Sequence, residues 1–286
     1  MPCQQARVLS PTGATRLAAV IGFPVRHSLS PVIHNAAFAA AGLDWVYVAL
    51  EVPPGQAGAA VAALRGLDIA GLSVTMPHKD DAARAVDRCT AVASRLEAVN
   101  CVYRDGGLLV GDNTDGAGFV DGLRLDHHVD PSGMRCVVLG AGGGARSVVQ
   151  ALGEAGTADV AVLNRTRSKA EVAAALAGPV GRVGDMADVA AAELVVNATP
   201  IGMGGTAAPA SLPFPATSLR TGQIVADLVV HPVRTALLIE AEARGAVPVD
   251  GLSMLVHQAA HGFRRWTDQE PPLDAMRAAV AHLRST

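Results

Sequence analysis

The sequence predicts an α/β protein of two domains, each built on a sheet of mainly parallel strands. Short runs of β-branched residues alternate with helical stretches rich in Ala and Leu, and this alternation is typical of parallel strands connected by helical crossovers. The 286 residues are enough for two domains of ordinary size. A second series of strands and helices begins at Met134 with a strand, a glycine-rich turn and a helix.

The first series predicts strands at 16–24, 45–52 and 69–76, alternating with helices at 30–42, 54–66 and 78–87. Ser30 is placed to cap the first of these helices, with Pro31 at its first position. The segment 98–113 is typical of a hairpin that turns at Asp105, Gly106 and Gly107.

The second series continues after the glycine turn with strands at 159–166, 194–200 and 223–230. We place the domain boundary near the helical segment 114–123 and the polar segment 126–133. The expected substrate domain is 1–115, and the expected dinucleotide-binding domain is 116–250. Two further helices are expected at 253–269 and 271–285, and periodicity alone does not assign them to either domain.

Charge and composition argue against several classes of function. The net charge is −3, and the chain has no basic run, zinc-finger spacing or aromatic RNA-binding motif, so we expect no nucleic-acid partner. No apolar run approaches the roughly 20 residues of a membrane-spanning helix, and no signal-peptide pattern is found. Because the four cysteines form no CxxC pair, we expect no disulfide framework and a cytoplasmic location. These cysteines are Cys3, Cys89, Cys101 and Cys136.

The glycine turn predicts a dinucleotide site. Its pattern is G-x-G-x-x-A, in which the first glycine permits the tight turn and the second lets the backbone approach a pyrophosphate. The alanine keeps helix and strand close, and the helix N-terminus supplies N–H donors. An idle loop is the alternative, which the strand–turn–helix context disfavours. The residues are Gly140, Ala141, Gly142, Gly143, Gly144 and Ala145.

The end of the next strand favours NADP over NAD. An NAD site usually has an Asp or Glu there to bind the ribose 2′-hydroxyl, and this chain has Asn164. Arg165, Thr166 and Lys169 follow, and a guanidinium can clamp a 2′-phosphate with paired hydrogen bonds. The alternative is an ordinary solvated start of the following helix.

Lys79 is the candidate proton-transfer group. It is one of only two lysines among 23 Lys and Arg residues, and a Lys amine can be tuned to release its proton where Arg cannot. A nicotinamide cofactor implies hydride transfer, for which the protein supplies a proton and orientation. Asp112 and Asp115 are the two candidate carboxylate partners, and the sequence does not choose between them.

Eight motifs occur in order along the chain that resemble those of the shikimate dehydrogenases. Single motifs of this kind are weak evidence, whereas eight in series are specific. They are GFPVRHSLSPVIHN (22–35), SVTMPHK (73–79), AVN (98–100), GDNTDG (111–116), GAGGGA (140–145), NRT (164–166), NATPIGM (197–203) and GLSMLVHQ (251–258).

The resemblance implies an NADP-dependent oxidoreductase of the shikimate pathway that reversibly reduces 3-dehydroshikimate to shikimate. It implies an α/β substrate domain, a Rossmann-like doubly wound NADP-binding domain, and C-terminal helices, 251–286, that return to the first domain. Lys79 and Asp115 would be the catalytic pair. Ser28 and Ser30 would hold the substrate carboxylate. The ring hydroxyls and Lys79 would be bound by Thr75, Asn100, Asp115 and Gln258. The nicotinamide end would be lined by Asn197, Thr199 and Met203.

Two positions depart from the family pattern and leave the substrate open. Ser73 stands where the family usually has Asn, and Val230 stands where it commonly has Tyr. A quinate or aminoshikimate-type dehydrogenase of the same family is therefore the alternative, and a catalytically idle dinucleotide-binding protein is a third hypothesis. A monomer or a homodimer is expected, with a small-molecule substrate.

His257 and His261 are four residues apart on an expected helix, a spacing that can bind zinc. Because the residue after His257 is Gln258 and no third ligand is evident, we expect no metal site.

Overall fold

The structure is a computed structural model that describes residues 11–205 and 210–284. Its internal contacts divide the chain into two compact units. Unit 1 contains the described residues up to Asn113 together with Ala259–His282, and unit 2 contains Thr114–Gln258 with the residues from Leu283 onward. The expectation of an α/β protein with two sheets is confirmed.

Unit 1 has a mixed sheet with strand order β2-β1-β3-β5-β6-β4. β1 runs parallel to both β2 and β3, while β5 runs antiparallel to β3 and β6. The strands are β1 (Arg16–Gly22), β2 (Trp45–Glu51), β3 (Gly71–Val74), β4 (Arg88–Cys89), β5 (Cys101–Asp105) and β6 (Leu108–Asp112). The predicted hairpin is confirmed as β5 and β6, with Gly106 and Gly107 both at positive φ, as a two-residue turn between twisted strands requires.

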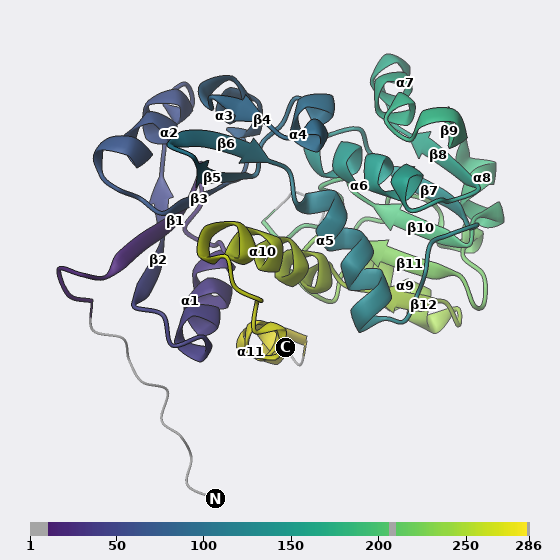
Figure 1. Cartoon of the computed structure of the whole chain (residues 1–286). Coiled ribbons are helices and arrows are strands. Elements are labelled where there is room, and N and C mark those ends of the chain that lie inside the picture. The colour runs from purple at the N-terminus through teal and green to yellow at the C-terminus, as the bar shows by residue number, and fades with distance from the viewer. Residues whose placement is uncertain (1–10, 206–209, 285–286) are drawn as a thin grey trace, which may run out of the picture. The chain divides into compact units, whose positions relative to one another are not determined.

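Helices cover both faces of the unit 1 sheet. α2 and α3 lie on one side and α1 on the other (Figure 1), and α11 packs against α1. The α1 side holds an aromatic cluster, in which the ring centroids of His34 and Tyr47 are 4.4 Å apart, and Trp266 Nε1 donates to Val102 O at 3.0 Å. The helices are α1 (Ser30–Ala40), α2 (Ala57–Gly66), α3 (Lys79–Ala85), α4 (Ala91–Leu96), α10 (Gly251–Thr267) and α11 (Leu273–Ala281).

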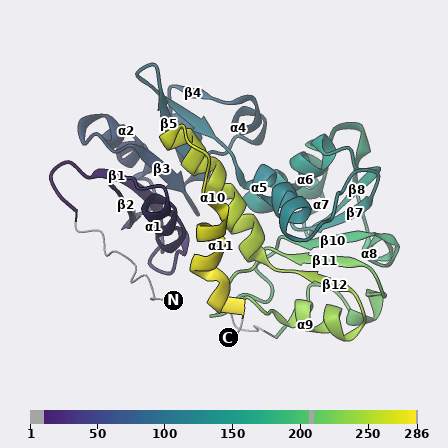
Figure 2. The same cartoon turned by 60° about the horizontal axis from the view of Figure 1, so that its bottom comes forward.

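Unit 2 has a wholly parallel sheet with strand order β12-β11-β10-β7-β8-β9. Figure 2 shows β12, β11, β10, β7 and β8 in this order. This is the doubly wound order, whose direction of winding reverses between β7 and β10, and such sheets bind ligands outside the carboxyl ends of the strands at that point. The strands are β7 (Arg135–Leu139), β8 (Asp159–Leu163), β9 (Gly181–Val183), β10 (Leu194–Asn197), β11 (Ile224–Asp227) and β12 (Val247–Val249).

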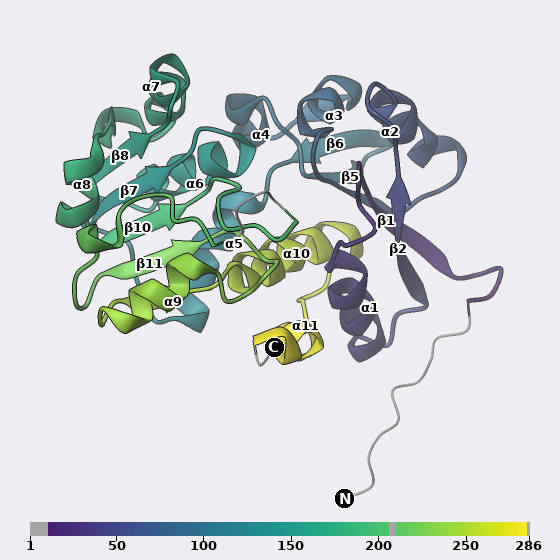
Figure 3. The ribbon, with the colours of Figure 1, turned by 180° about the vertical axis from the view of Figure 1, so that it is seen from behind.

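Alternating side chains of these strands build two cores. Val138 and Val196 pack toward α5, α6 and α7, whereas Val137 and Val195 pack toward α8 and α9. Figure 3 shows α9 against β11 on this second face. The helices are α5 (Asp115–Asp121), α6 (Gly143–Glu154), α7 (Arg167–Ala175), α8 (Met186–Ala191) and α9 (Ala236–Ala243). A π-helical turn, Gly122–Asp126, follows α5.

The C-terminal helices divide between the units. The unit boundary falls inside α10, between Gln258 and Ala259, and α11 belongs to unit 1. The last part of α10 and all of α11 therefore belong to unit 1, whereas residues 251–258, which the expected range 251–286 also includes, belong to unit 2.

Several local expectations need correction. Ser30 does not cap the first helix: α1 begins at Ser30, its N-cap position is Leu29, and Ser28 Oγ accepts from Ser30 N–H at 3.3 Å. The sequence patterns also failed to predict α4, α8, α9, β4, β9 and β12, because segments of two to eight residues are too short to show a period. Cys89, Cys101 and Cys136 are free thiols, and Cys3 lies outside the described residues.

Candidate active site

The glycine turn lies at the switch point of the unit 2 sheet, between β7 and α6. Gly140 has φ +111°, and a Cβ there would lie 2.9 Å from Ala198 O, so only glycine allows the loop after β10 to approach this closely. A Cβ on Gly142 or Gly143 would meet nothing within 4 Å. The start of α6 is therefore open to a ligand, with the N–H groups of its first turn available as donors.

A pocket of about 690 Å³ opens beside this turn. It brings together Gly140 and Thr199 with the predicted residues that follow β8, namely Asn164, Arg165, Thr166 and Lys169. Sequence reasoning missed the far wall, where Asp185 caps α8 by accepting from Ala187 N–H at 2.8 Å, and Met186 is exposed beside it. The complete lining is Leu139, Gly140, Leu163, Asn164, Arg165, Thr166, Lys169, Gly184, Asp185, Met186, Thr199, Pro200, Ile201 and Pro213.

The cations of this pocket suit a dinucleotide that carries a 2′-phosphate. Both cations are exposed: Arg165 follows β8, and Lys169 lies in the first turn of α7. Asn164 Nδ2 donates to Thr166 O at 2.9 Å and so holds the turn between β8 and α7. Arg167, in contrast, pairs with Glu171 at 3.1 Å and does not line the pocket. The position after β8 that would carry an acid in an NAD site is an amide here.

The loop after β10 forms part of the same wall. Thr199 N and Oγ1 donate to Asn197 Oδ1 at 3.1 and 2.7 Å, which holds Thr199 at the pocket. Met203 lies further along the loop with 37% of its surface exposed and does not line this pocket. Val230, one of the two departures from the family pattern, is partly buried just beyond the end of β11.

In unit 1, Lys79 is the first residue of α3 and is held through its main chain. Lys79 O accepts from Val99 N–H at 3.0 Å. His78, which precedes it, is fully buried, and its Nε2–H donates to Val52 O at 2.7 Å. These two contacts fix the start of the helix, while the Lys79 side chain is only partly buried.

Thr75 and Asn100 lie beside Lys79 at the carboxyl end of β3. Val74 N–H donates to Asn100 O at 2.8 Å, and Asn100 N–H donates to Asp112 O at 3.0 Å. Asn100 is 3% exposed. These main-chain hydrogen bonds bring residues that carry a hydroxyl, an amide and an amine to one strand end, a set suited to a small polyhydroxylated ligand.

Ser28 and Ser30 follow the neighbouring strand end. β1 and β3 are parallel partners, with Ile21 opposite Val74, so the loop after β1 leaves the sheet at the same edge as Thr75. A Cβ on Gly22 would lie 2.5 Å from Thr75 Cγ2, and glycine there permits this approach. Ser73, the other departure from the family pattern, lies inside β3 opposite Cys101.

The two candidate carboxylates lie in different surroundings. Asp112 accepts from two side chains: Arg265 Nε and Nη2 donate to its Oδ2 at 3.1 and 2.9 Å, and Thr90 Oγ1 donates to its Oδ1 at 2.7 Å. Asp115 lies in the first turn of α5 and is 7% exposed, where the helix dipole favours a negative charge.

Asp115 and Gln258 are neighbours in unit 2. Thr114 Oγ1 donates to Gln258 O at 3.1 Å, and a Cβ on Gly118 would lie 2.4 Å from Gln258 N. The contacts within each unit therefore group the predicted substrate residues into two sets: Ser28, Ser30, Thr75, Lys79 and Asn100 in unit 1, and Asp115 and Gln258 in unit 2.

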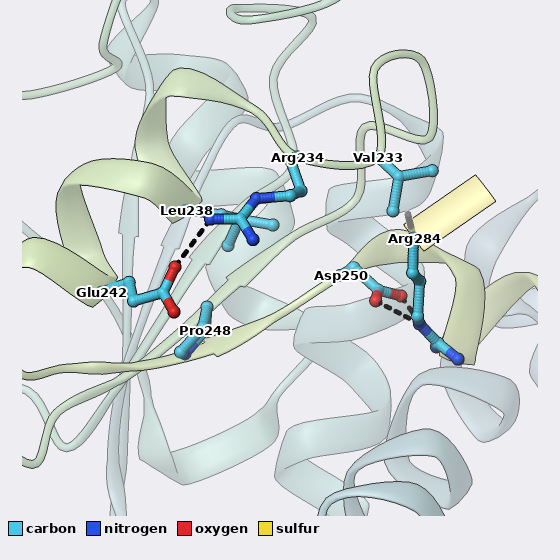
Figure 4. Close-up of a pocket in the computed structure, with 7 residues that line it drawn as sticks. All are labelled: Val233, Arg234, Leu238, Glu242, Pro248, Asp250 and Arg284. Atoms are coloured by element: carbon cyan, nitrogen blue, oxygen red, sulfur yellow. Dashed lines mark hydrogen bonds and ion pairs between the residues drawn. The ribbon is translucent and has the colours of Figure 1, made fainter. Parts of the chain in front are cut away.

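A second pocket, of about 180 Å³, lies in unit 2 and has paired charges (Figure 4). Arg234 Nη2 lies 2.8 Å from Glu242 Oε2, and Arg284 Nε lies 2.7 Å from Asp250 Oδ2. Because each guanidinium already faces a carboxylate, these charges are engaged with each other and do not mark a substrate site.

Within residues 11–205 and 210–284, no group of three or more His, Cys, Asp or Glu is arranged to hold a metal ion. His257 Nε2 lies 3.0 Å from Asp126 Oδ1, which gives this histidine a carboxylate partner. In the same part of the chain, no helix has both the length and the apolar character needed to cross a bilayer.

Comparison with known families identifies both ends of the chain. Residues 20–102 match the shikimate dehydrogenase substrate binding domain, and residues 251–281 match the shikimate 5′-dehydrogenase C-terminal domain. The shikimate dehydrogenase (NADP(+)) of Moorella thermoacetica is 44% identical over 273 residues, which cover 92% of this chain and 92% of that protein.

Solved structures of both shikimate and quinate dehydrogenases are similar over nearly the whole chain. Shikimate 5-dehydrogenase from Thermus thermophilus, in complex with NADP(H) and shikimate, is 35% identical with a TM-score of 0.87, covering 94% of this chain and 100% of that one. Quinate dehydrogenase from Corynebacterium glutamicum, in complex with NAD, is 31% identical with a TM-score of 0.85, covering 94% of this chain and 99% of that one.

Proposed function

The chain belongs to the shikimate dehydrogenase family and catalyses the reversible, NADP-dependent reduction of 3-dehydroshikimate to shikimate, and we propose that Lys79 and Asp115 are its catalytic pair. The observation that carries this assignment is the position of Asp115, which is 7% exposed in the first turn of α5 and follows Thr114, the residue that donates to Gln258 O. Of the two carboxylates in GDNTDG, Asp115 is the one that we assign to the substrate, as the family resemblance implies.

Lys79 is the group that moves the proton. NADPH, when bound, supplies the hydride for the carbonyl carbon of the substrate. The ammonium of Lys79 donates a proton to the carbonyl oxygen, and in the reverse direction its neutral amine accepts the proton of the hydroxyl. The carboxylate of Asp115 stabilises the ammonium form and orients it.

The other predicted substrate residues orient the ring. We propose that Ser28 and Ser30 bind the substrate carboxylate, since they stand at the start of α1, where the helix N–H groups also favour an anion. Thr75, Asn100 and Gln258 would read the ring hydroxyls. A site of this kind rejects an analogue that lacks a hydroxyl, because buried polar groups are then left unpaired.

The cofactor residues divide by the part of NADP that they meet. Gly140, Ala141, Gly142, Gly143, Gly144 and Ala145 would hold the pyrophosphate. Asn164, Arg165, Thr166 and Lys169 would hold the 2′-phosphate, because they bring two cations and no acid to the end of β8. Thr199 and Met203 would contact the nicotinamide half.

We also propose that the enzyme acts in the cytoplasm, as a monomer or homodimer. The support for the location is the state of the cysteines: burial raises the pKa of the Cys101 and Cys136 thiols, and both are free, as suits a reducing compartment.

The test is a comparison of kcat/KM for shikimate and quinate, each measured with NADP and with NAD. We expect the highest value for shikimate with NADP. A higher value for quinate would indicate the related quinate activity, and the absence of turnover in all four combinations would indicate an idle nucleotide-binding protein.

A further inference from the structure

Asp227 is a buried carboxylate at the end of β11, outside the proposed catalytic and binding groups. It is 1% exposed. Its Oδ1 accepts from Asn197 Nδ2 at 2.9 Å and from Val229 N–H at 3.1 Å, and its Oδ2 accepts from Thr235 Oγ1 at 2.7 Å. A buried charge is costly unless it is fully hydrogen-bonded, so three donors aimed at one carboxylate indicate a specific structural task.

One branch of this network leads to the dinucleotide pocket. Asn197, the last residue of β10, is completely buried. Besides its bond to Asp227, its Nδ2 donates to Ile201 O at 3.1 Å, and its Oδ1 accepts from both Thr199 N and Thr199 Oγ1. Thr199 and Ile201 line the pocket. The Asn197 amide therefore connects Asp227 to the pocket wall by hydrogen bonds.

The other branch leads to α9. Thr235 is completely buried and caps this helix by accepting from Leu238 N–H at 3.3 Å. The loops after β10 and β11 are joined a second time where Gly204 N–H donates to His231 O at 2.6 Å. Asp227 thus binds two loops and a helix start into one assembly.

We propose that Asp227 is a positioning residue for the dinucleotide site, acting through Asn197 on the wall formed by Thr199 and Ile201. The proposal rests on the NADP dependence of the proposed function. Asp227 does not line the pocket, and the wall that it supports follows β10, whereas Arg165 and Lys169 follow β8. It therefore sets affinity for the part of the cofactor that NADP and NAD share, and it does not read the 2′-phosphate.

The chemistry of the donors explains why a carboxylate is needed. All three groups that face Asp227 donate hydrogen bonds, and a carboxylate accepts every one. In Asp227→Asn, one oxygen becomes an NH₂ group, which faces a donor instead of accepting from it. Burial raises the pKa of Asp227, and the bonds from Thr235, Val229 and Asn197 oppose that rise.

The experiment is a titration of the full-length protein with NADPH alone, followed by nicotinamide fluorescence, for Asp227→Asn and wild type. We expect the Kd for NADPH to rise about tenfold, which corresponds to the loss of one hydrogen bond to a charged group. KM for NADP and KM for NAD should rise by the same factor, so that the preference between them is unchanged.

Thr235 supplies a matched pair of variants. Thr235→Val removes the hydroxyl and should weaken NADPH binding as Asp227→Asn does, whereas Thr235→Ser keeps the hydroxyl and should stay within about twofold of wild type. If Asp227→Asn does not fold, the Thr235 pair decides the question.

The proposal is overturned if folded variants bind NADPH with the wild-type Kd and fluorescence, even where they melt earlier, because the role is then structural only. A changed preference between NADP and NAD in these variants would also contradict the proposal. If the wild-type protein binds NADPH normally but does not turn over shikimate, that result contradicts the proposed function and leaves this inference intact.

Discussion

Arg265 and Asp112 form an ion pair that ties the end of α10 to the end of β6. Two nitrogens of the guanidinium share one carboxylate oxygen, at 3.1 and 2.9 Å. The carboxylate is 8% exposed and the guanidinium side chain 48% exposed, and the guanidinium carbon lies 5.2 Å from the centroid of the Tyr103 ring. Because Asp112 O accepts from Asn100 N–H, this pair supports a predicted substrate residue.

Arg265→Ala should therefore weaken both stability and substrate binding. Removing one partner of a buried pair costs roughly 3–5 kcal/mol, and we expect about 1–2 kcal/mol here because the guanidinium is half exposed to water. Urea unfolding would measure this loss, and steady-state kinetics should show a raised KM for shikimate. Arg264→Ala is the matched control, since Arg264 pairs with the exposed Glu270. Equal effects in the two variants would argue against the anchoring role.

Lys79→Ala should lower kcat by about 10²–10⁴, the usual contribution of a general acid or base, with a smaller change in KM. The reason is that the amine is proposed to move a proton in the reacting step and not to hold the substrate. Arg84→Ala removes an exposed cation from the same helix, where it pairs with Asp81, and should leave kcat near the wild-type value. A Lys79→Ala enzyme within a few-fold of wild type would exclude proton transfer by this residue.

The sequence predicted those parts of the fold and site that are determined by neighbouring residues. A short motif records the local backbone requirement of Gly140 between its strand and helix. Another short motif does the same for the two hairpin glycines. The residues that follow β8 could be assigned to the pocket because a short motif also marks the end of that strand. Their pocket is built largely from segments at the ends of neighbouring strands, and strand order in a parallel sheet follows from connectivity.

The parts that could not be predicted depend on contacts between distant segments. Asp112 and Asp115 lie in one motif, and the sequence does not show that Asp112 pairs with Arg265, 153 positions later. The Asp227 network joins strand ends 30 positions apart. Ser30 and Pro31 predict a cap at Ser30, but their residue types do not specify where the first helical turn begins, and α1 has its N-cap at Leu29.

Arg165→Ala should weaken NADP binding about 10- to 100-fold, because charge-assisted hydrogen bonds to a phosphate are worth roughly 1.5–3 kcal/mol. NAD carries no 2′-phosphate, so its affinity should change little. Calorimetric titration with each cofactor would measure the difference. Arg167→Ala is the control, as Arg167 pairs with Glu171 outside the pocket. Equal losses for NADP and NAD would contradict the phosphate clamp.

His34 makes stability depend on pH. It is completely buried on α1, within ring-centroid distances of 4.4 Å from Tyr47 and 4.9 Å from Trp266, and neither ring nitrogen has a hydrogen-bond partner among the described residues. Burial disfavours the charged imidazolium and lowers the pKa of His34 from 6.5 to about 3.

Because the folded pKa lies below the unfolded value, the unfolded chain binds a proton first as the pH falls. The stability associated with neutral His34 is complete above pH 6.5 and is lost progressively between pH 6.5 and about 3. At about 1.4 kcal/mol per pH unit, the loss at pH 5 is about 2 kcal/mol. Urea unfolding at pH 7.5 and pH 5 should show wild type losing about 2 kcal/mol more than His34→Phe, which keeps an aromatic ring and cannot titrate. His128→Ala, which removes an exposed histidine, should keep the wild-type pH dependence. The same dependence in His34→Phe would mean that another group titrates in its place.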